Sequence, residues 1–141
     1  MFNENKQIIT TDYEALRAWC RSQPQPQQQA FKAFISYLTQ KHLVRKLKSK
    51  KTNFCYQHTS YGLKHVVERL SDVLGKHEYV SNEDFIIAMV QAGFDVKNAC
   101  EKRQGNFRYL VSPNYYFNLP KFRETLSWQS ELLTGVQDGR Y

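Results

Sequence analysis

The fold is decided by residues 60–94, which read SYGLKHVVERLSDVLGKHEYVSNEDFIIAMVQAGF. Apolar residues recur there at helical spacing and would share one face of a first helix, namely Leu63, Val66, Val67, Leu70 and Leu74. Thr59 or Ser60 fits the N-cap of this helix, and Gly75 fits the position just after its end. The sequence therefore predicts a helix over residues 61–74.

The polar residues of this helix are expected to face solvent, and they are Lys64, Glu68, Arg69 and Asp72. Lys64 and Glu68 are four positions apart, which predicts an ion pair along the helix. A second helix over residues 82–92 is indicated by Ser81, a favourable N-cap, and by Gly93 at its end.

Two short aromatic runs follow, at residues 107–111 and 115–119. The intervening Ser-Pro-Asn, residues 112–114, has turn chemistry, so the two runs are predicted to pair as a β-hairpin. Residues 60–119 thus have the element order of a winged helix, although the turn between the helices is longer than in a strict helix-turn-helix. We expect a small, mostly helical α+β domain with one β-hairpin. Winged-helix-like packing is one alternative, and another small α+β or mostly helical arrangement is the other.

Upstream of this region the sequence predicts two further helices. Thr11 and Glu14 have the spacing of a capping box, which indicates a helix over residues 12–21. A segment rich in proline and glutamine ends it, because proline lacks an amide donor and restricts the preceding residue. A longer amphipathic helix over residues 27–48 follows, and a last helix is predicted over residues 121–134.

The predicted domain organisation is simple. Residues 1–22 would form an N-terminal helix and residues 23–29 a Pro/Gln linker. Residues 30–135 would form a single α+β domain, with its basic helix at 30–51. Residues 136–141 would be a tail. The sequence leaves open whether the N-terminal helix packs on this domain.

The positive charge is concentrated in one block. The 141 residues include 20 Lys or Arg and 13 Asp or Glu, a net charge of +7. Residues 15–67 contain ten bases and no acid, and residues 41–51 are the densest part. Such a block attracts polyanions, most often nucleic acid. An acidic protein partner and a solvated helix face are the alternatives.

Several function classes lack their signals. No apolar run approaches the roughly 20 residues that span a bilayer, and residues 1–10 lack the apolar stretch of a signal peptide. Three widely spaced cysteines suit a reducing cytoplasm. Cys55 and His58 form only one metal-type pair, and no nucleophile signature, P-loop or dinucleotide motif is present. We therefore expect a cytoplasmic protein with no membrane segment, catalytic activity, cofactor or metal.

The candidate binding residues combine cations with aromatic rings. Exposed tyrosines stack on bases or anchor protein interfaces, and the start of the helix at residue 61 offers amides to a phosphate, with Lys64 as a mobile cation. The alternatives are a core built of aromatics and ordinary helix capping. The candidates are Lys41, Arg45, Lys46, Lys48, Lys50, Lys51, Tyr61, Lys64, His65, Arg108, Tyr115 and Tyr116.

Two strings, residues 60–65 and residues 79–86 with the following Ala-Gly-Phe at 92–94, resemble a pattern in small proteins of phages and mobile elements. Some of that group are inhibitors of host defence of the anti-CRISPR type. The resemblance implies a small accessory protein that engages DNA, RNA or a nucleoprotein complex. The alternative is a protein inhibitor of a host defence nuclease complex that acts by protein–protein binding. A second copy of the chain, forming a homodimer, is a further candidate partner.

Overall fold

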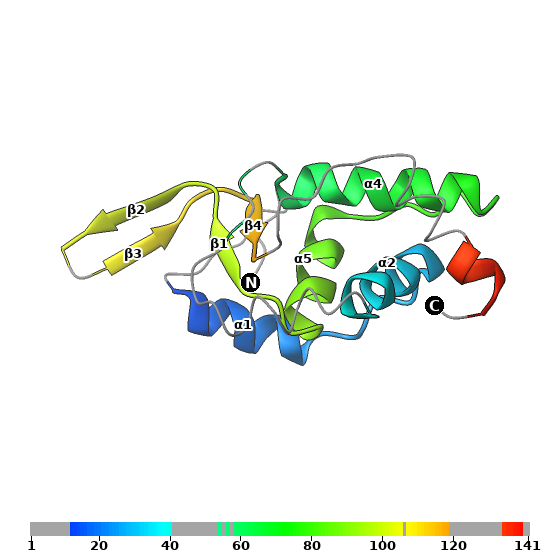
Figure 1. Cartoon of the computed structure of the whole chain (residues 1–141). Coiled ribbons are helices and arrows are strands. Elements are labelled where there is room, and N and C mark those ends of the chain that lie inside the picture. Colours follow the sequence, from blue (N-terminus) through cyan, green and yellow to red (C-terminus); the bar gives the residue numbers. More distant parts are fainter. Residues whose placement is uncertain are drawn as a thin grey trace.

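The first helix packs on the rest of the molecule. The computed structural model describes residues 12–40, 54, 56, 58–105, 107–118 and 134–139. Helix α1, Tyr13–Ser22, contributes Leu16 and Cys20 to the core and lies against helix α5, Asn82–Gln91 (Figure 1). The sequence left open whether this helix packs on the domain, and the structure shows that it does.

The start of α1 differs from the expectation by one position. Asp12 is its N-cap, because Asp12 has extended backbone angles and its Oδ1 accepts from the Ala15 N–H at 2.6 Å. The helix therefore begins at Tyr13. The predicted cap, Thr11, lies outside the described residues.

Helix α2, Gln29–Gln40, follows the Pro/Gln segment and buries the rings of Phe31 and Phe34 against Phe85 of α5. The Gln29 N–H donates to Glu78 at 3.0 Å, which ties the start of α2 to the segment before α5. The predicted start of this helix, residue 27, was two positions early. Its predicted continuation over residues 41–48 lies outside the described residues. So do residues 121–133 of the last helix, predicted over residues 121–134, and its final residue begins a short helical segment at 134–137.

The two helices of the deciding stretch are confirmed. Helix α4, Ser60–Val73, is capped by Thr59, and α5 is capped by Ser81. Helix α4 closes on Gly75, whose φ of 76° suits glycine, and the amides of Gly75 and Lys76 return to carbonyls in its last turn. Helix α5 is the central element, because six consecutive residues, 85–90, are buried.

The β-hairpin is present, but the predicted pairing was wrong. Strand β3, Phe107–Leu110, pairs antiparallel with β2, Glu101–Gln104, and β4, Tyr115–Phe117, pairs with β1, Val96–Asn98. The chain reverses between Gln104 and Phe107, which face each other, and Gly105 has the positive φ of 61° that such a turn needs. The reversal therefore lies between Gln104 and Phe107 and not at 112–114.

Residues 112–114 instead form a kink in one long hairpin, and Asn98 holds it. The buried side chain of Asn98 accepts from the N–H groups of Cys100 and Ser112, at 2.9 and 3.1 Å, and donates to the Ser112 carbonyl at 2.8 Å. On one side of this kink the β1–β4 pair packs against the helices. On the other side the β2–β3 pair, residues 101–110, projects from the body, and we call it the arm (Figure 1).

These elements confirm the predicted class, a small, mostly helical α+β domain with one β-hairpin. The order helix, turn, helix, hairpin is also observed from α4 to β4, although the hairpin begins at Val96. Winged-helix-like packing stays a prediction. Within the described ranges, the helices are too short or too polar to cross a bilayer.

Candidate nucleic-acid interface

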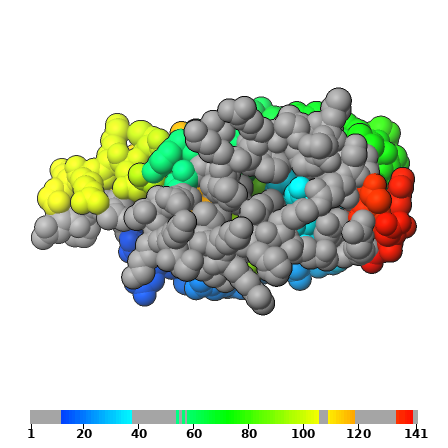
Figure 2. Space-filling model, in the orientation of Figure 1, coloured from blue at the N-terminus to red at the C-terminus, as the bar shows by residue number. Residues whose placement is uncertain are grey.

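The arm carries its positive charge on a projecting surface. Lys102, Arg103 and Gln104 are all exposed, and they lie at one end of the molecule in the space-filling view (Figure 2). In the strand register Lys102 faces Tyr109, and Arg103 faces Arg108. The hairpin from residue 96 to residue 118 contains four basic residues and one acid. The arm is thus a second basic region, separate in sequence from residues 41–51.

The single acid of the arm is bound to the body. The Tyr13 hydroxyl of α1 donates to the Glu101 carboxylate and accepts from the Asn98 N–H, the latter at 2.7 Å. Burial, followed by the hydrogen bond to Glu101, raises the pKa of Tyr13 far above its usual value, so this hydroxyl remains a donor. The carboxylate at the base of the arm is therefore fixed toward α1.

The two faces of the arm differ in what they present. Glu101 and its cross-strand neighbour Leu110, which is buried, face the body. Because side chains alternate along a strand, Lys102 and its neighbour Tyr109 face away. Tyr109 is 39% exposed. A shallow hollow of about 480 Å³ lies there, and its lining residues are Lys102, Arg103, Gln104, Tyr109 and Val111.

A second group of cations and rings lies where the arm joins the body, and we call it the root cluster, made of Tyr56, Lys97 and Tyr116. Lys97 Nζ lies 3.0 Å from the Tyr56 hydroxyl and 5.2 Å from the centre of its ring. The rings of Tyr56 and Tyr116 pack edge to face, with their centres 5.1 Å apart. Tyr116 of β4 is the cross-strand neighbour of Lys97 of β1. The hydrogen bond to Tyr56 raises the pKa of Lys97, so its positive charge is retained.

Tyr115 belongs to the core, which corrects its prediction as a binding residue. Its side chain is fully buried beside Phe117, and its N–H donates to Ser60 at the start of α4 at 3.1 Å. Burial raises the pKa of Tyr115 to about 12. Alternation along β4 turns residues 115 and 117 inward and leaves Tyr116 partly exposed. Tyr115 therefore has no exposed ring to offer a base.

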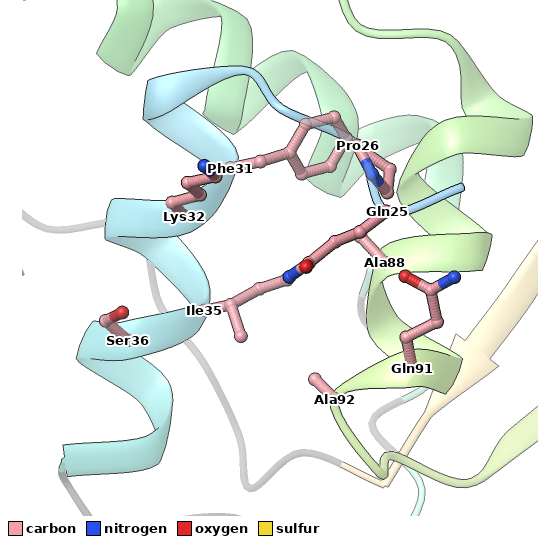
Figure 3. A pocket seen from close by; sticks show the side chains of 9 residues that line it. All are labelled: Gln25, Pro26, Phe31, Lys32, Ile35, Ser36, Ala88, Gln91 and Ala92. Carbon is pink, nitrogen blue, oxygen red and sulfur yellow. The ribbon is translucent and has the colours of Figure 1, made fainter. Parts of the chain in front are cut away.

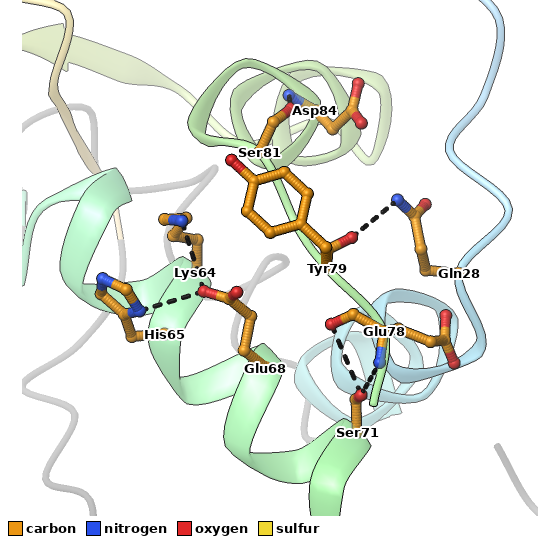
Figure 4. A network of polar contacts seen from close by, with 9 residues as sticks. All are labelled: Gln28, Lys64, His65, Glu68, Ser71, Glu78, Tyr79, Ser81 and Asp84. Atoms are coloured by element: carbon orange, nitrogen blue, oxygen red, sulfur yellow. Dashed lines mark hydrogen bonds and ion pairs between the residues drawn. The ribbon is translucent and has the colours of Figure 1, made fainter. Parts of the chain in front are cut away.

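The predicted cluster at the start of α4 does come together, but Lys64 is not a mobile cation. Its side chain is buried, Nζ lies 3.3 Å from Glu68, and the rings of Tyr61 and Tyr79 lie 5.4 and 5.0 Å away. His65 contacts the same Glu68 oxygen at 3.0 Å (Figure 4). The predicted Lys64–Glu68 pair is confirmed, whereas the expected exposure of Lys64 was wrong.

Tyr79 covers Lys64 because the segment before α5 is tied down on both sides. The Ser71 hydroxyl of α4 accepts from the Glu78 N–H, and Gln28 donates to the Tyr79 carbonyl at 3.4 Å (Figure 4). The ring of Tyr79 is 71% exposed, and that of Tyr61 is 53% exposed. This cluster therefore offers two exposed aromatic rings around a paired, buried ammonium group.

The remaining predicted residues are not placed. The backbone of Arg108 belongs to β3, but its side chain is outside the part of the molecule that the structure describes. So are the residues of the basic block, which are Lys41, Arg45, Lys46, Lys48, Lys50 and Lys51. Their assignment stays a prediction.

Lys97, Lys102 and Arg103 were not among the binding residues predicted from the sequence. One feature of the sequence points to Lys102 and Arg103. A Gly-Asn pair at residues 105–106 lies between two runs that contain cations, and this dipeptide is typical of two-residue hairpin turns. Read that way, Lys102 and Arg103 fall on a strand next to the turn.

A pocket of about 310 Å³ lies between α2 and α5, away from the arm (Figure 3). Lys32 supplies the single charge among its described lining residues, and the Gln91 amide donates to the carbonyls of Cys20 and Gln23 at 3.1 and 2.8 Å. Burial raises the pKa of the nearby Cys20 thiol to about 12, so it keeps its proton. The described residues contain no group of three or more His, Cys, Asp or Glu side chains arranged to hold a metal ion.

Comparisons of the chain with known protein families, with curated proteins and with solved structures find no match.

Proposed function

We propose that this chain binds nucleic acid and that the arm is a principal contact element. The observation that carries the proposal is the projecting arm with Lys102 and Arg103 exposed, while the one acid among residues 101–110, Glu101, is bound to Tyr13. A cationic element that stands clear of the body can reach phosphates without burying its own charges.

Two basic regions support the same partner. Residues 15–67 supply ten bases and no acid, and the hairpin adds four bases against one acid. Each phosphate that a Lys or Arg neutralises releases counterions, so affinity should fall steeply as salt rises. The exposed rings of Tyr61, Tyr79 and Tyr109 can add stacking on unpaired bases. In this proposal the chain acts by binding and has no catalytic role.

The experiment is a salt titration of binding to a labelled DNA duplex of about 25 base pairs, followed by fluorescence anisotropy. The double variant Lys102→Gln, Arg103→Gln removes two arm charges. The matched control, Arg69→Gln with Lys76→Gln, removes two exposed charges from α4 and from the residues just after it, both outside residues 15–67 and outside the arm.

We expect the arm variant to reduce the slope of log affinity against log salt by roughly 1 to 2, because each phosphate contact contributes about 0.9. The control should leave the slope within about 0.5 of the wild type. Equal slopes for the two variants would reject the arm as a contact element. Absence of binding to any nucleic acid would reject the function.

The alternative, an inhibitor of a nucleoprotein defence complex, is separated by a pull-down from host lysate with and without nuclease. A direct nucleic-acid binder loses its retained material after nuclease treatment, whereas an inhibitor keeps one protein complex. The origin of the chain in a phage or mobile element is proposed with this alternative, and it rests on the resemblance of residues 60–94.

A further inference from the structure

From the geometry of the arm we infer that it enters the major groove of B-form DNA and places Lys102 and Gln104 against the base edges. This inference rests on the proposed function and specifies its substrate. It concerns the class of nucleic acid and the groove, neither of which follows from charge alone.

The dimensions of the arm suit that groove. Two paired strands lie about 4.8 Å apart, and four residues of β2 extend about 13 Å. The major groove of B-DNA is about 12 Å wide and 8.5 Å deep, and it admits a two-stranded ribbon. The arm has two strands and no covering helix on its outward face, so no other element of the described chain keeps it out of the groove (Figure 1). The major groove of A-form RNA is too narrow and deep for such a ribbon.

The outward face has the chemistry of base readout. Lys102 and Gln104 share that face by alternation, and both are exposed. Lysine donates to N7 and O6 of guanine, and glutamine pairs with N6 and N7 of adenine, all on the major-groove edge. Tyr109 and Val111 are partly exposed beside them and provide an apolar surface for the thymine methyl group.

The inward face cannot make such contacts at its base. Leu110 is buried there, and Glu101 is bound by Tyr13. A carboxylate that faced the groove would be repelled by both phosphate backbones, so its attachment to the body removes a charge that opposes entry. The two faces thus differ at the base of the arm, whereas Arg103, farther out on the inward face, is exposed and can reach a phosphate.

The test uses the full chain and four probes of one sequence: B-form duplex DNA, duplex RNA, single-stranded DNA, and duplex DNA with its purines replaced by 7-deaza purines. The 7-deaza bases retain pairing and phosphates but lack the N7 acceptor. The variant Gln104→Ala removes a neutral side chain from the arm, and Gln137→Ala removes an exposed glutamine from the distant helical segment as its control.

We expect the wild type to bind the DNA duplex about tenfold more tightly than the RNA duplex, the single strand and the 7-deaza duplex. Gln104→Ala should reduce the preference over the 7-deaza duplex severalfold with an unchanged salt slope, since it removes no charge. Gln137→Ala should leave both unchanged. Circular dichroism establishes that each variant is folded.

Equal affinity for the normal and 7-deaza duplexes would overturn the groove assignment, and so would tighter binding of the single strand or the RNA duplex. Each of those results would still leave nucleic-acid binding in place. Absence of binding to all four probes would instead reject the proposed function itself, so the two failures are distinguishable.

Discussion

The two halves of the hairpin have the same kind of backbone pairing and opposite surroundings. In the β1–β4 half, Val96, Tyr115 and Phe117 are buried. The ring centres of Phe117 and Phe85 of α5 lie 5.7 Å apart. In the β2–β3 half, Lys102, Arg103 and Gln104 are exposed. An isolated two-stranded ribbon is only marginally stable in water. The first half therefore anchors the hairpin, and the second half is free to carry side chains selected for contact.

The largest expected difference between the halves is in core packing. Phe117→Ala should lower the free energy of unfolding by about 3–5 kcal/mol, because it leaves a cavity beside Phe85. Tyr109→Ala on the arm should lower it by less than about 1 kcal/mol. Urea unfolding followed by circular dichroism measures both. A cost for Tyr109→Ala that equals that of Phe117→Ala would show that the arm is part of the core.

The junction between the halves comes next. Asn98→Ala removes two acceptor contacts and one donor contact at the kink, and part-buried backbone groups of Cys100 and Ser112 lose these partners. We expect a loss of about 2–3 kcal/mol in the free energy of unfolding. Hydrogen exchange of the Ser112 amide should accelerate in parallel. A fully stable variant with a protected Ser112 amide would contradict this role for Asn98.

The stability of the fold at alkaline pH tests the burial of Tyr115. The pKa of Tyr115 is raised from 10.0 to about 12 in the folded state, so the unfolded chain loses this proton first. Its contribution to stability is fully present below pH 10 and is lost as the pH rises toward about 12. Tyr115→Phe should flatten the fall in stability over this range by roughly 2 kcal/mol.

A substitution in the turn of the arm should destabilise the arm and leave the helices unaffected. Gly105 has a positive φ, and a Cβ added there meets nothing within 4 Å, so Gly105→Ala costs only backbone strain, about 1 kcal/mol. Amide exchange in β2 should accelerate while exchange in α5 stays slow. Gly105→Asn is the matched variant, because asparagine tolerates this conformation better. Slower folding or a molten core in Gly105→Ala would contradict the separation of the two halves.

The smallest expected effect concerns the acid at the base of the arm. Tyr13→Phe removes the hydroxyl that donates to the Glu101 carboxylate, so this acid is held less firmly toward α1 and away from bound phosphates. We expect a two- to threefold loss of affinity for duplex DNA at about 50 mM salt that disappears at high salt, as screening increases. Glu101→Gln in the same background should restore the affinity. Failure of that rescue would assign the loss to altered folding.

The parts of the fold that were correctly predicted have local signals. Thr59 and Ser81 specify helix starts because their side chains accept from nearby amides, and Gly75 specifies an end through its positive φ, so α4 and α5 were located almost to the residue. Strand pairing depends on distant partners. The strand β2, with the sequence EKRQ, has no apolar alternation because neither face of its outer part is buried, so no pattern indicated that it pairs with β3.

The candidate site was predicted only in part, for similar reasons. Lys64 lies off the apolar stripe of α4 and was expected in solvent, but Tyr79 from a later segment covers it. The alternation along β4 separated Tyr115 from Tyr116 without showing which of them faces the core. The Tyr13–Glu101 contact joins residues 88 positions apart, and no sequence pattern announces it.

The hydrogen bonds of the Asn98 side chain at the kink have a consequence for how this protein can be altered. They satisfy the backbone groups of the kink from the core side, so the fold imposes few requirements on the residues beyond it. Residues 102–109 can therefore be exchanged as a cassette, with the helices and β1–β4 as an unchanged scaffold. Libraries randomised on the outward face of the arm would then vary in recognition while they share one stability.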